Sequence, residues 1–308
     1  MRKISCGAEQ ESHAIRSSLR AAAVLLYPCL YTLETTMDDI PYLLRGITQM
    51  TTASSTLISS SRYLNSPELR DWMAQELLRK NGPDLPTPSG AFRLSGIIKG
   101  LQNYAEIDAM LEDERKRLPA LDKFLAERFK STYTLEDLAK YPPDSVAGLF
   151  YKQINDGGYQ VNIVPPWDAK GHYDYWLLRS GQCHDLEHII THGGFDSLGE
   201  VVVGLAKLEN IYKHFSPELA GELAVMQFLT SFRFISRMAL HYPQVWHDMW
   251  GAVDRGRKIG MASDPYLMSR YEDVFHLTPV EARKVLGVRE VDDTLDTTLP
   301  SRIWDGKA

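Results

Sequence analysis

Apolar residues recur every three to four positions along most of this chain, which is the period of an amphipathic α-helix. Proline and capping residues near the starts of several segments, and glycine pairs near the ends, agree with this period. The predicted helices span residues 39–61, 69–78, 107–129, a short segment from 134, 145–155, 173–192, 198–214, 217–241, 244–260 and 279–286.

Two stretches depart from the helical period. Residues 159–164 alternate in the manner of a strand, and residues 81–90 are so rich in turn formers that a loop is expected. There is no internal repeat and no strand–helix–strand alternation. The sequence therefore predicts an all-α protein, a single multi-helix domain with at most a minor β-hairpin. We divide the chain into an N-terminal extension (1–36), the helical domain (37–287) and a loose C-terminal tail (288–308).

Composition narrows the class of protein. The 308 residues are 44% hydrophobic and 24% charged, which is ordinary for a folded globular chain. A formal charge of −6 argues against nucleic acid as a partner. Three widely separated cysteines do not make a disulfide framework, so a reducing compartment is expected.

No segment is long enough to cross a membrane as a helix. The best apolar run, residues 21–31, is interrupted by Pro28 and falls short of the ~20 residues needed. Two arginines before it imitate a signal peptide, but two glutamates also precede it and no clean cleavage site follows. We expect a cytoplasmic protein that contacts a membrane surface peripherally.

Candidate chemistry is concentrated in one short segment. Of nine histidines, three fall within nine positions: His184, His188 and His192. At ~100° per residue they lie at about 0°, 40° and 80° around a helix, with Asp185 near 100°. Histidines four residues apart are spaced as in zinc-binding H-E-x-x-H helices. Aspartate replaces the glutamate that a metalloprotease uses as its base, which argues against a protease.

A second helix is expected to bring another carboxylate to this stripe. The first helix should end at Gly193–Gly194, and the next, beginning near Leu198, should run back so that Glu200 lies beside the histidines. Two imidazoles and two carboxylates suit a divalent metal ion. We expect Zn²⁺ first, with Mn²⁺, Fe²⁺ or Mg²⁺ as alternatives.

Each of these residues also has a structural explanation. Glu200 completes an S-x-x-E capping box, which needs no metal. Asp185 could serve to orient His188, and His192 could be a hydrogen-bond partner of a ligand or a proton shuttle. Cys183 points off the stripe and is expected to be a packed thiol.

The motif resembles a known family. His184-Asp185-x-x-His188, followed by eleven residues and Glu200, is similar to the H-D-x-x-H-x(11)-E signature of the coenzyme Q (ubiquinone) biosynthesis family called Coq-four. The resemblance extends over roughly residues 37–287. Further similar segments are residues 135–138, 142–151, 198–208, 251–260 and 271–287.

This resemblance implies an all-helical fold, a metal held by His184, Asp185, His188 and Glu200, and a groove for a polyprenyl chain. It also implies a protein at a membrane surface, the matrix side of the mitochondrial inner membrane in a eukaryote, that organises other ubiquinone-biosynthesis enzymes. Family members are linked to removal of the C1 carboxyl group from a prenylated aromatic ring, with oxidation of that carbon. An arginine is expected close before the motif, and Arg179 lies five positions upstream.

Other features fit a prenyl-lipid substrate but have simpler explanations. Residues 201–208 and 220–241 are apolar enough to line a lipid channel, or simply to form a helical core. Arg255, Arg257 and Lys258 could meet an anionic head group, or form a solvated basic face. The apolar helices also make a homodimer an expected assembly.

Three functional hypotheses follow. The first is a metal-dependent decarboxylase or lyase acting on a polyprenylated quinone precursor or another prenyl lipid. In the second, the chain is a non-catalytic prenyl-lipid-binding scaffold. The third is a metal phosphohydrolase of the HD type, although that class needs a further upstream histidine and His172 lies only twelve residues before His184.

Overall fold

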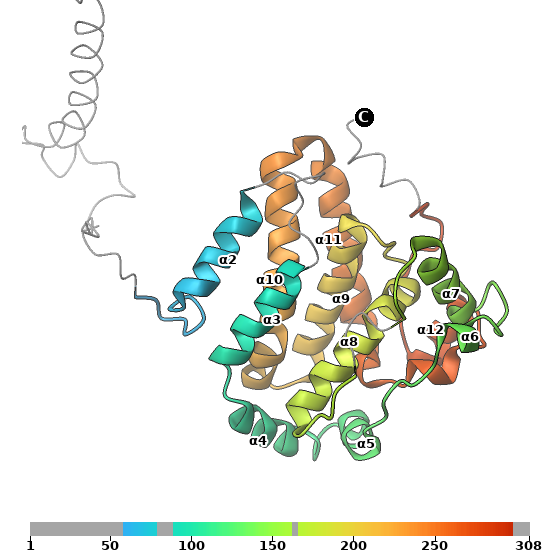
Figure 1. Cartoon of the computed structure of the whole chain (residues 1–308), viewed down its shortest axis with the longest axis horizontal. Helices are drawn as coiled ribbons and strands as arrows, with labels where there is room; N and C mark the ends of the chain where they lie inside the picture. Colours follow the sequence, from blue (N-terminus) through green and yellow to red (C-terminus); the bar gives the residue numbers. More distant parts are fainter. Residues whose placement is uncertain (1–57, 79–88, 162–165, 298–308) are drawn as a thin grey trace, which may run out of the picture. The chain divides into compact units, whose positions relative to one another are not determined.

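The structure is a computed structural model, and it describes residues 58–78, 89–161 and 166–297. Every regular element in these residues is a helix (Figure 1). The elements in chain order are α2 (Pro67–Leu77), α3 (Ser89–Leu101), α4 (Tyr104–Glu114), α5 (Pro119–Glu127), α6 (Leu135–Leu138), α7 (Val146–Gly157), α8 (His172–Thr191), α9 (Ser197–His214), α10 (Pro217–His241), η2 (Pro243–Val245), α11 (Trp246–Ala262), η3 (Tyr266–Met268), η4 (Tyr271–Val274) and α12 (Pro279–Leu286).

Local signals in the sequence set many of these boundaries. The Ser66 side chain caps α2 by accepting from the Leu69 backbone N–H, and Thr134 forms a full capping box at the start of α6. Gly158, with φ of 63°, ends α7 in the left-handed region that favours glycine. The predicted helices 217–241 and 279–286 are confirmed residue for residue.

Some predictions differ from the structure. The helix predicted over 107–129 is two helices, because Pro119 has no N–H to continue α4 and instead begins α5. Helix α3 was not expected, since Gly90, Gly96 and Gly100 weaken its helical pattern. Residues 159–161 form no strand, residues 162–164 lie outside the described part, and no strand occurs in the part that the structure describes. The all-α prediction is confirmed, without a β-hairpin in those residues.

Several predicted features lie outside the described residues. They include the apolar run at 21–31, the boundary between 36 and 37, and most of the helix predicted over 39–61. Within the described residues, none of the helices combines the length and the apolar character needed to cross a bilayer.

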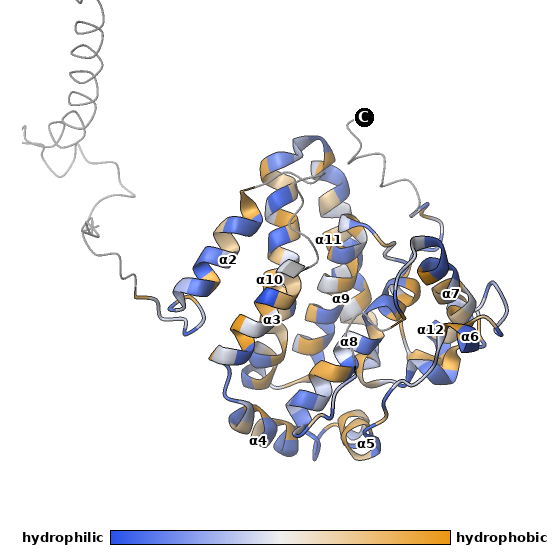
Figure 2. Cartoon of the chain, viewed as in Figure 1, coloured by the Kyte–Doolittle hydropathy of each residue, from blue (hydrophilic) through white to orange (hydrophobic). Residues whose placement is uncertain are grey.

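Helix α9 packs against α8, α10 and α11 in the main hydrophobic core. Its contact with α11 is close because α11 presents glycines to the α9 backbone. A Cβ atom on Gly256 would lie 2.5 Å from the Val202 carbonyl oxygen, and Gly260 approaches the Ala206 carbonyl in the same way. Figure 2 shows that hydrophobic and hydrophilic residues are interspersed along the helices.

A smaller hydrophobic cluster joins α2 and α3 to α10. Beside it, the buried Glu76 carboxylate of α2 accepts from Arg233 at 3.1 Å and Arg237 at 2.8 Å, both from α10. The cluster consists of Leu69, Trp72, Leu94, Ile97, Ile98 and Leu229.

The described part of the C-terminal tail, up to residue 297, contacts the end of α8. The Arg283 side chain donates to the Ile190 carbonyl at 2.8 Å and to the Asp293 carboxylate at 2.6 Å. Further along, the His192 Nε2 atom lies 2.9 Å from the Leu295 carbonyl oxygen. These contacts involve specific partners that sequence periodicity does not reveal.

Candidate metal centre

Two helices and a tight turn build the candidate centre. Helix α8 carries His184 and His188, one helical turn apart, and ends at Thr191. The chain reverses through Gly194, whose φ of 75° favours glycine, and the Asp196 side chain then caps α9 by accepting from a backbone N–H at 2.8 Å. This reversal brings Glu200 back to the two histidines.

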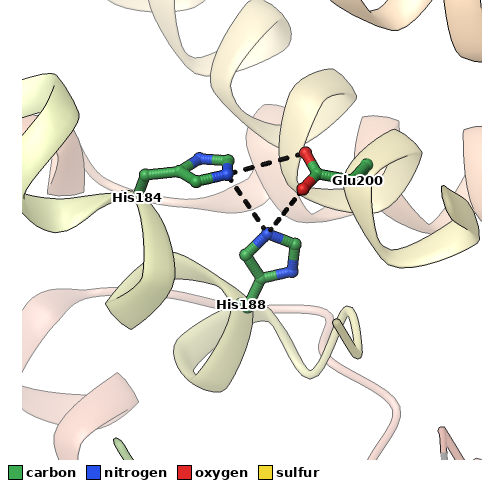
Figure 3. Close-up of side chains that lie close together, drawn as sticks. All are labelled: His184, His188 and Glu200. Carbon is green, nitrogen blue, oxygen red and sulfur yellow. Dashed lines mark hydrogen bonds and ion pairs between the residues drawn. The ribbon is translucent and has the colours of Figure 1, made fainter. Parts of the chain in front are cut away.

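The three side chains point toward one another (Figure 3). The His184 and His188 Nε2 atoms are 3.4 Å apart. Each lies 3.6 Å from one of the two Glu200 carboxylate oxygens, His184 from Oε2 and His188 from Oε1. One ligand atom from each residue falls within 4.8 Å of the others, so a single ion could contact all three.

These separations fit a metal ion better than direct hydrogen bonds. An N–H···O bond spans about 2.7–3.2 Å, shorter than either histidine–glutamate distance. With bonds of ~2.1 Å at tetrahedral angles, neighbouring donor atoms lie about 3.4 Å apart. The donor set and its spacing are therefore compatible with a divalent metal ion such as Zn²⁺.

The turn after α8 also orients His188. Its Nδ1 lies in a short hydrogen bond with the Gly194 carbonyl oxygen, so Nδ1 carries the proton and the Nε2 lone pair faces the centre. The Phe195 ring stacks on the imidazole with a centroid separation of 4.9 Å. Neither contact was predicted from the sequence, although the Gly193–Gly194 pair indicated a tight turn at this point.

The histidines and Glu200 perturb one another electrostatically. Burial would raise the pKa of Glu200, but the neighbouring His184 and His188 outweigh it and hold that pKa well below its ordinary value. Burial opposes the charged form of His184, yet Glu200 raises its pKa above the ordinary value. The site thus stabilises a carboxylate facing positive charge, which is the electrostatic environment that a cation would also supply.

The structure excludes the capping-box explanation of Glu200. Asp196, and not Ser197, occupies the N-cap position of α9, so the capping box predicted with Glu200 does not form. The carboxylate of Glu200 instead faces His184 and His188.

Asp185 lies outside this group of three ligand atoms. It is close enough to feel the same charges: burial raises its pKa, and His184 and His188 act in the opposite direction. The predicted four-residue set is therefore reduced to three converging residues, with Asp185 beside them.

His192 does not continue the predicted histidine stripe. The helix ends at Thr191, and His192 has a φ of 53°, outside the helical region. Its Nε2 atom faces the Leu295 carbonyl, so the structure does not bring it into the group with the other histidines.

Two residues that precede the motif in the sequence, Cys183 and Arg179, are buried. Cys183 is buried, and burial raises the pKa of its thiol to about 12, in agreement with the expected packed thiol. Arg179 is also buried and pairs with Glu272 at 3.1 Å, with side-chain exposures of 3% and 10%. The arginine expected near the motif therefore belongs to a buried ion pair.

The three basic residues of α11 differ in their environments. Arg257 pairs with Glu209 and Lys258 with Asp254, each at 2.7 Å, and both side chains are exposed. Arg255 is only partly exposed. Arg257 and Lys258 therefore belong to a solvated, internally paired surface.

Comparison with known proteins gives a likeness of fold. The sequence matches no protein-family model and no curated protein. Among solved structures, the chain resembles a protein of Nostoc punctiforme that is provisionally named a ubiquinone biosynthesis protein. The TM-score is 0.54 at 14% identity, covering 73% of this chain and 94% of the Nostoc chain. The described helices therefore form a fold similar to that of this Nostoc protein.

Proposed function

We propose that this protein binds one divalent metal ion, preferably Zn²⁺, through His184, His188 and Glu200, and acts in ubiquinone biosynthesis. The expected substrate is a polyprenylated aromatic quinone precursor, and the expected reaction is loss of its C1 carboxyl group.

The observation that carries the metal proposal is the convergence of three side chains: the two Nε2 atoms lie 3.4 Å apart, and each lies 3.6 Å from a different carboxylate oxygen of Glu200. His188 is only 1% exposed and its proton is directed away from the centre. Because Nδ1 is engaged with the Gly194 carbonyl, Nε2 is the His188 atom available to a metal ion. Asp185 remains a candidate for a fourth ligand.

The exposure of the site favours a catalytic over a purely structural ion. The His184 and Glu200 side chains are each 30% exposed, so a small group can reach the centre. Structural zinc sites usually have four protein ligands, whereas catalytic sites keep one position open. Three converging ligands fit the second pattern.

Two independent likenesses support the pathway. The fold is similar to that of a Nostoc protein provisionally named for ubiquinone biosynthesis. The spacing of His184, Asp185, His188 and Glu200 resembles the Coq-four signature, and three of these four residues converge in the structure. A convergence of this kind is what a functional signature requires.

A prenyl substrate would reach the protein from a membrane, because each CH₂ moved out of water contributes ~0.8 kcal/mol. The expected channel residues Val201 and Val203 are fully buried, so this part of α9 forms core. Two pairs of neighbouring aromatic rings are instead exposed, Phe228 with Phe232 on α10 and Trp246 with Trp250 on α11. We propose that these rings meet the membrane or the lipid, and that partner enzymes of the pathway assemble on the protein at the membrane.

When bound, the metal would supply Lewis-acid polarisation of a carboxylate or phenolic oxygen. His184 and Glu200, being partly exposed, would border the group that enters, while buried His188 holds the centre in place. The carboxyl group would leave as CO₂, and a proton from solvent would take its place on the ring carbon. Hydroxylation of the same carbon would instead need O₂ together with a two-electron donor, with the second oxygen atom leaving as water.

The phosphohydrolase hypothesis is less well supported. At 1.5 Å per residue, His172 lies ~18 Å from His184 along the same helix. Its Nε2 atom lies 3.1 Å from a carboxylate oxygen of Glu112, at the opposite end of α8 from the turn that leads to α9. His172 therefore cannot complete an HD-type centre with His184.

The test is release of labelled CO₂ from a 4-hydroxy-3-polyprenylbenzoate carrying the label in its carboxyl group, in air and without O₂. Release by the zinc-loaded protein, and its loss in His188→Ala, would support the enzyme. Lipid binding without release from the metal-loaded protein would favour the scaffold. Phosphate release from a phosphomonoester with divalent metal would favour the phosphohydrolase.

A further inference from the structure

A buried ion pair links the two helices that carry the candidate ligands. The Lys207 Nζ atom of α9 lies 2.7 Å from the Glu187 Oε2 atom of α8. The two side chains are only 6% and 2% exposed. Burying both charges is costly, and such pairs often stabilise a fold no better than apolar residues would. The pair therefore calls for another explanation.

Lys207 lies on the same face of α9 as Glu200, and Glu187 lies about 60° from His184 around α8. Lys207 follows Glu200 by seven residues, which at ~100° per residue returns to within about 20° of the same face of α9. On α8, Ser180 precedes His184 by four residues, and the Ser180 Oγ atom lies 3.1 Å from Lys207 Nζ. We call these facing positions the α8–α9 seam: Ser180, His184, Glu187, His188, Glu200 and Lys207.

Close to Glu200, the other side chains that α9 buries are aliphatic, and they would define its alignment against α8 less sharply. Val201, Val202 and Val203 follow Glu200 directly and are all buried. Aliphatic side chains of similar shape tolerate small shifts, because dispersion contacts are weak and lack direction. A rotation of α9 by one residue would turn Glu200 by ~100° away from the histidines. A charged hydrogen bond of 2.7 Å permits no such rotation.

We propose that Lys207 and Glu187 are positioning residues of the metal centre: their ion pair fixes the alignment of α8 and α9 that brings Glu200 to His184 and His188. Neither belongs to the group of converging ligand atoms. This inference rests on the proposed metal binding. In it, Lys207 and Glu187 hold the metal ligands in place without binding the metal themselves.

The experiment measures Zn²⁺ affinity by chelator competition, and the Co²⁺ absorption spectrum, in the full-length protein. The variants are Lys207→Met, the milder Ser180→Ala, and the neutral double variant Glu187→Gln with Lys207→Met. Glu272→Gln is the matched control. It removes the negative charge that pairs with a different buried cation, Arg179 of α8, and changes no residue of the α8–α9 seam. Unfolding by urea is measured for each metal-free variant.

Lys207→Met should weaken Zn²⁺ binding by about 10–100-fold and alter the Co²⁺ spectrum, as outer supports of metal sites do. Ser180→Ala should weaken it by a smaller factor. The double variant should regain stability without regaining affinity, and Glu272→Gln should lose stability while binding Zn²⁺ normally. Unchanged affinity in the seam variants, or affinity that follows stability in all four proteins, would overturn the inference. A wild-type protein that binds no metal would instead overturn the proposed function itself.

Discussion

The Nε2 atom of His188 and the Oε1 atom of Glu200 lie 3.6 Å apart, because the chain reverses direction in the turn between Thr191 and Ser197. The same turn supplies the Gly194 carbonyl that fixes the proton on His188. One reversal of the chain thus places the carboxylate and orients the imidazole.

The position of Asp185 predicts that it is not an essential ligand. Because its carboxylate lies outside the group of three converging atoms, Asp185→Asn should keep one Zn²⁺ per chain, with affinity reduced by less than about tenfold. Metal content after dialysis, measured by elemental mass spectrometry, checks this. Loss of the metal from Asp185→Asn alone would show that Asp185 completes the site as a fourth ligand.

The charges of the site predict a stability window for the metal-free protein. The pKa of Glu200 is lowered from 4.5, so its contribution is present above pH 4.5 and lost as the pH falls through the folded-state value. The pKa of His184 is raised from 6.5, so its contribution is present below pH 6.5 and lost as the pH rises through the folded-state value. The stability difference between wild type and Glu200→Gln should therefore be largest between these two values.

Urea unfolding of both metal-free proteins from about pH 4 to pH 8 measures this window. Zn²⁺ affinity should rise over the same range, because the metal competes with protons for the imidazoles. A stability difference that stays constant across the range would show that Glu200 and His184 do not interact as described.

The close packing of α9 and α11 predicts different costs for two glycine substitutions on one helix. Gly256→Ala should destabilise the protein by about 1–3 kcal/mol, because the new methyl group meets the Val202 carbonyl. Gly251→Ala is the matched control: its Cβ would enter open space, so it should be neutral or stabilising by up to ~1 kcal/mol. Equal effects in denaturant titrations would contradict the packing described here.

His192 is predicted to hold the C-terminal tail more than it serves the metal. His192→Ala removes the contact with the Leu295 carbonyl, so backbone amides near Leu295 should exchange hydrogen faster while Zn²⁺ content stays unchanged. Hydrogen exchange with mass spectrometry and CO₂ release are the measurements. Full turnover in the variant would exclude His192 as a proton shuttle, whereas lost turnover with normal metal binding would restore that role.

Periodicity and capping signals predicted the all-α class and many helix boundaries. These signals are local: Ser66 and Thr134 act within one helical turn of their own position. Helix α3 was missed because its stability depends on packing against α2 and α10, and its three glycines hide the helical pattern. Long-range packing of this kind cannot be seen from the spacing of residues along one helix.

The candidate site was also only partly predictable. His184 and His188 share a face by helix geometry alone, and the Gly193–Gly194 pair predicted the return of Glu200. Asp185 lies about 100° from His184 around the helix, and its carboxylate does not join the three converging ligand atoms. His192 was misplaced because the helix ended one residue earlier than predicted. The Lys207–Glu187 pair went unnoticed, although a lysine in such an apolar helix was a visible signal.

Native mass spectrometry tests the central claim most directly, because one spectrum of gently purified protein reports bound metal and retained lipid together. The wild-type chain should carry one divalent ion with the mass of zinc, and His188→Ala and Glu200→Ala should each lose it, with affinity reduced by more than about 100-fold. Cys183→Ala should retain the ion, because that thiol is buried in the core. A prenyl-sized adduct on the wild type would support the quinone proposal. A wild-type protein that binds no added zinc would contradict the account. One metal ion per chain in both His188→Ala and Glu200→Ala would contradict it as well.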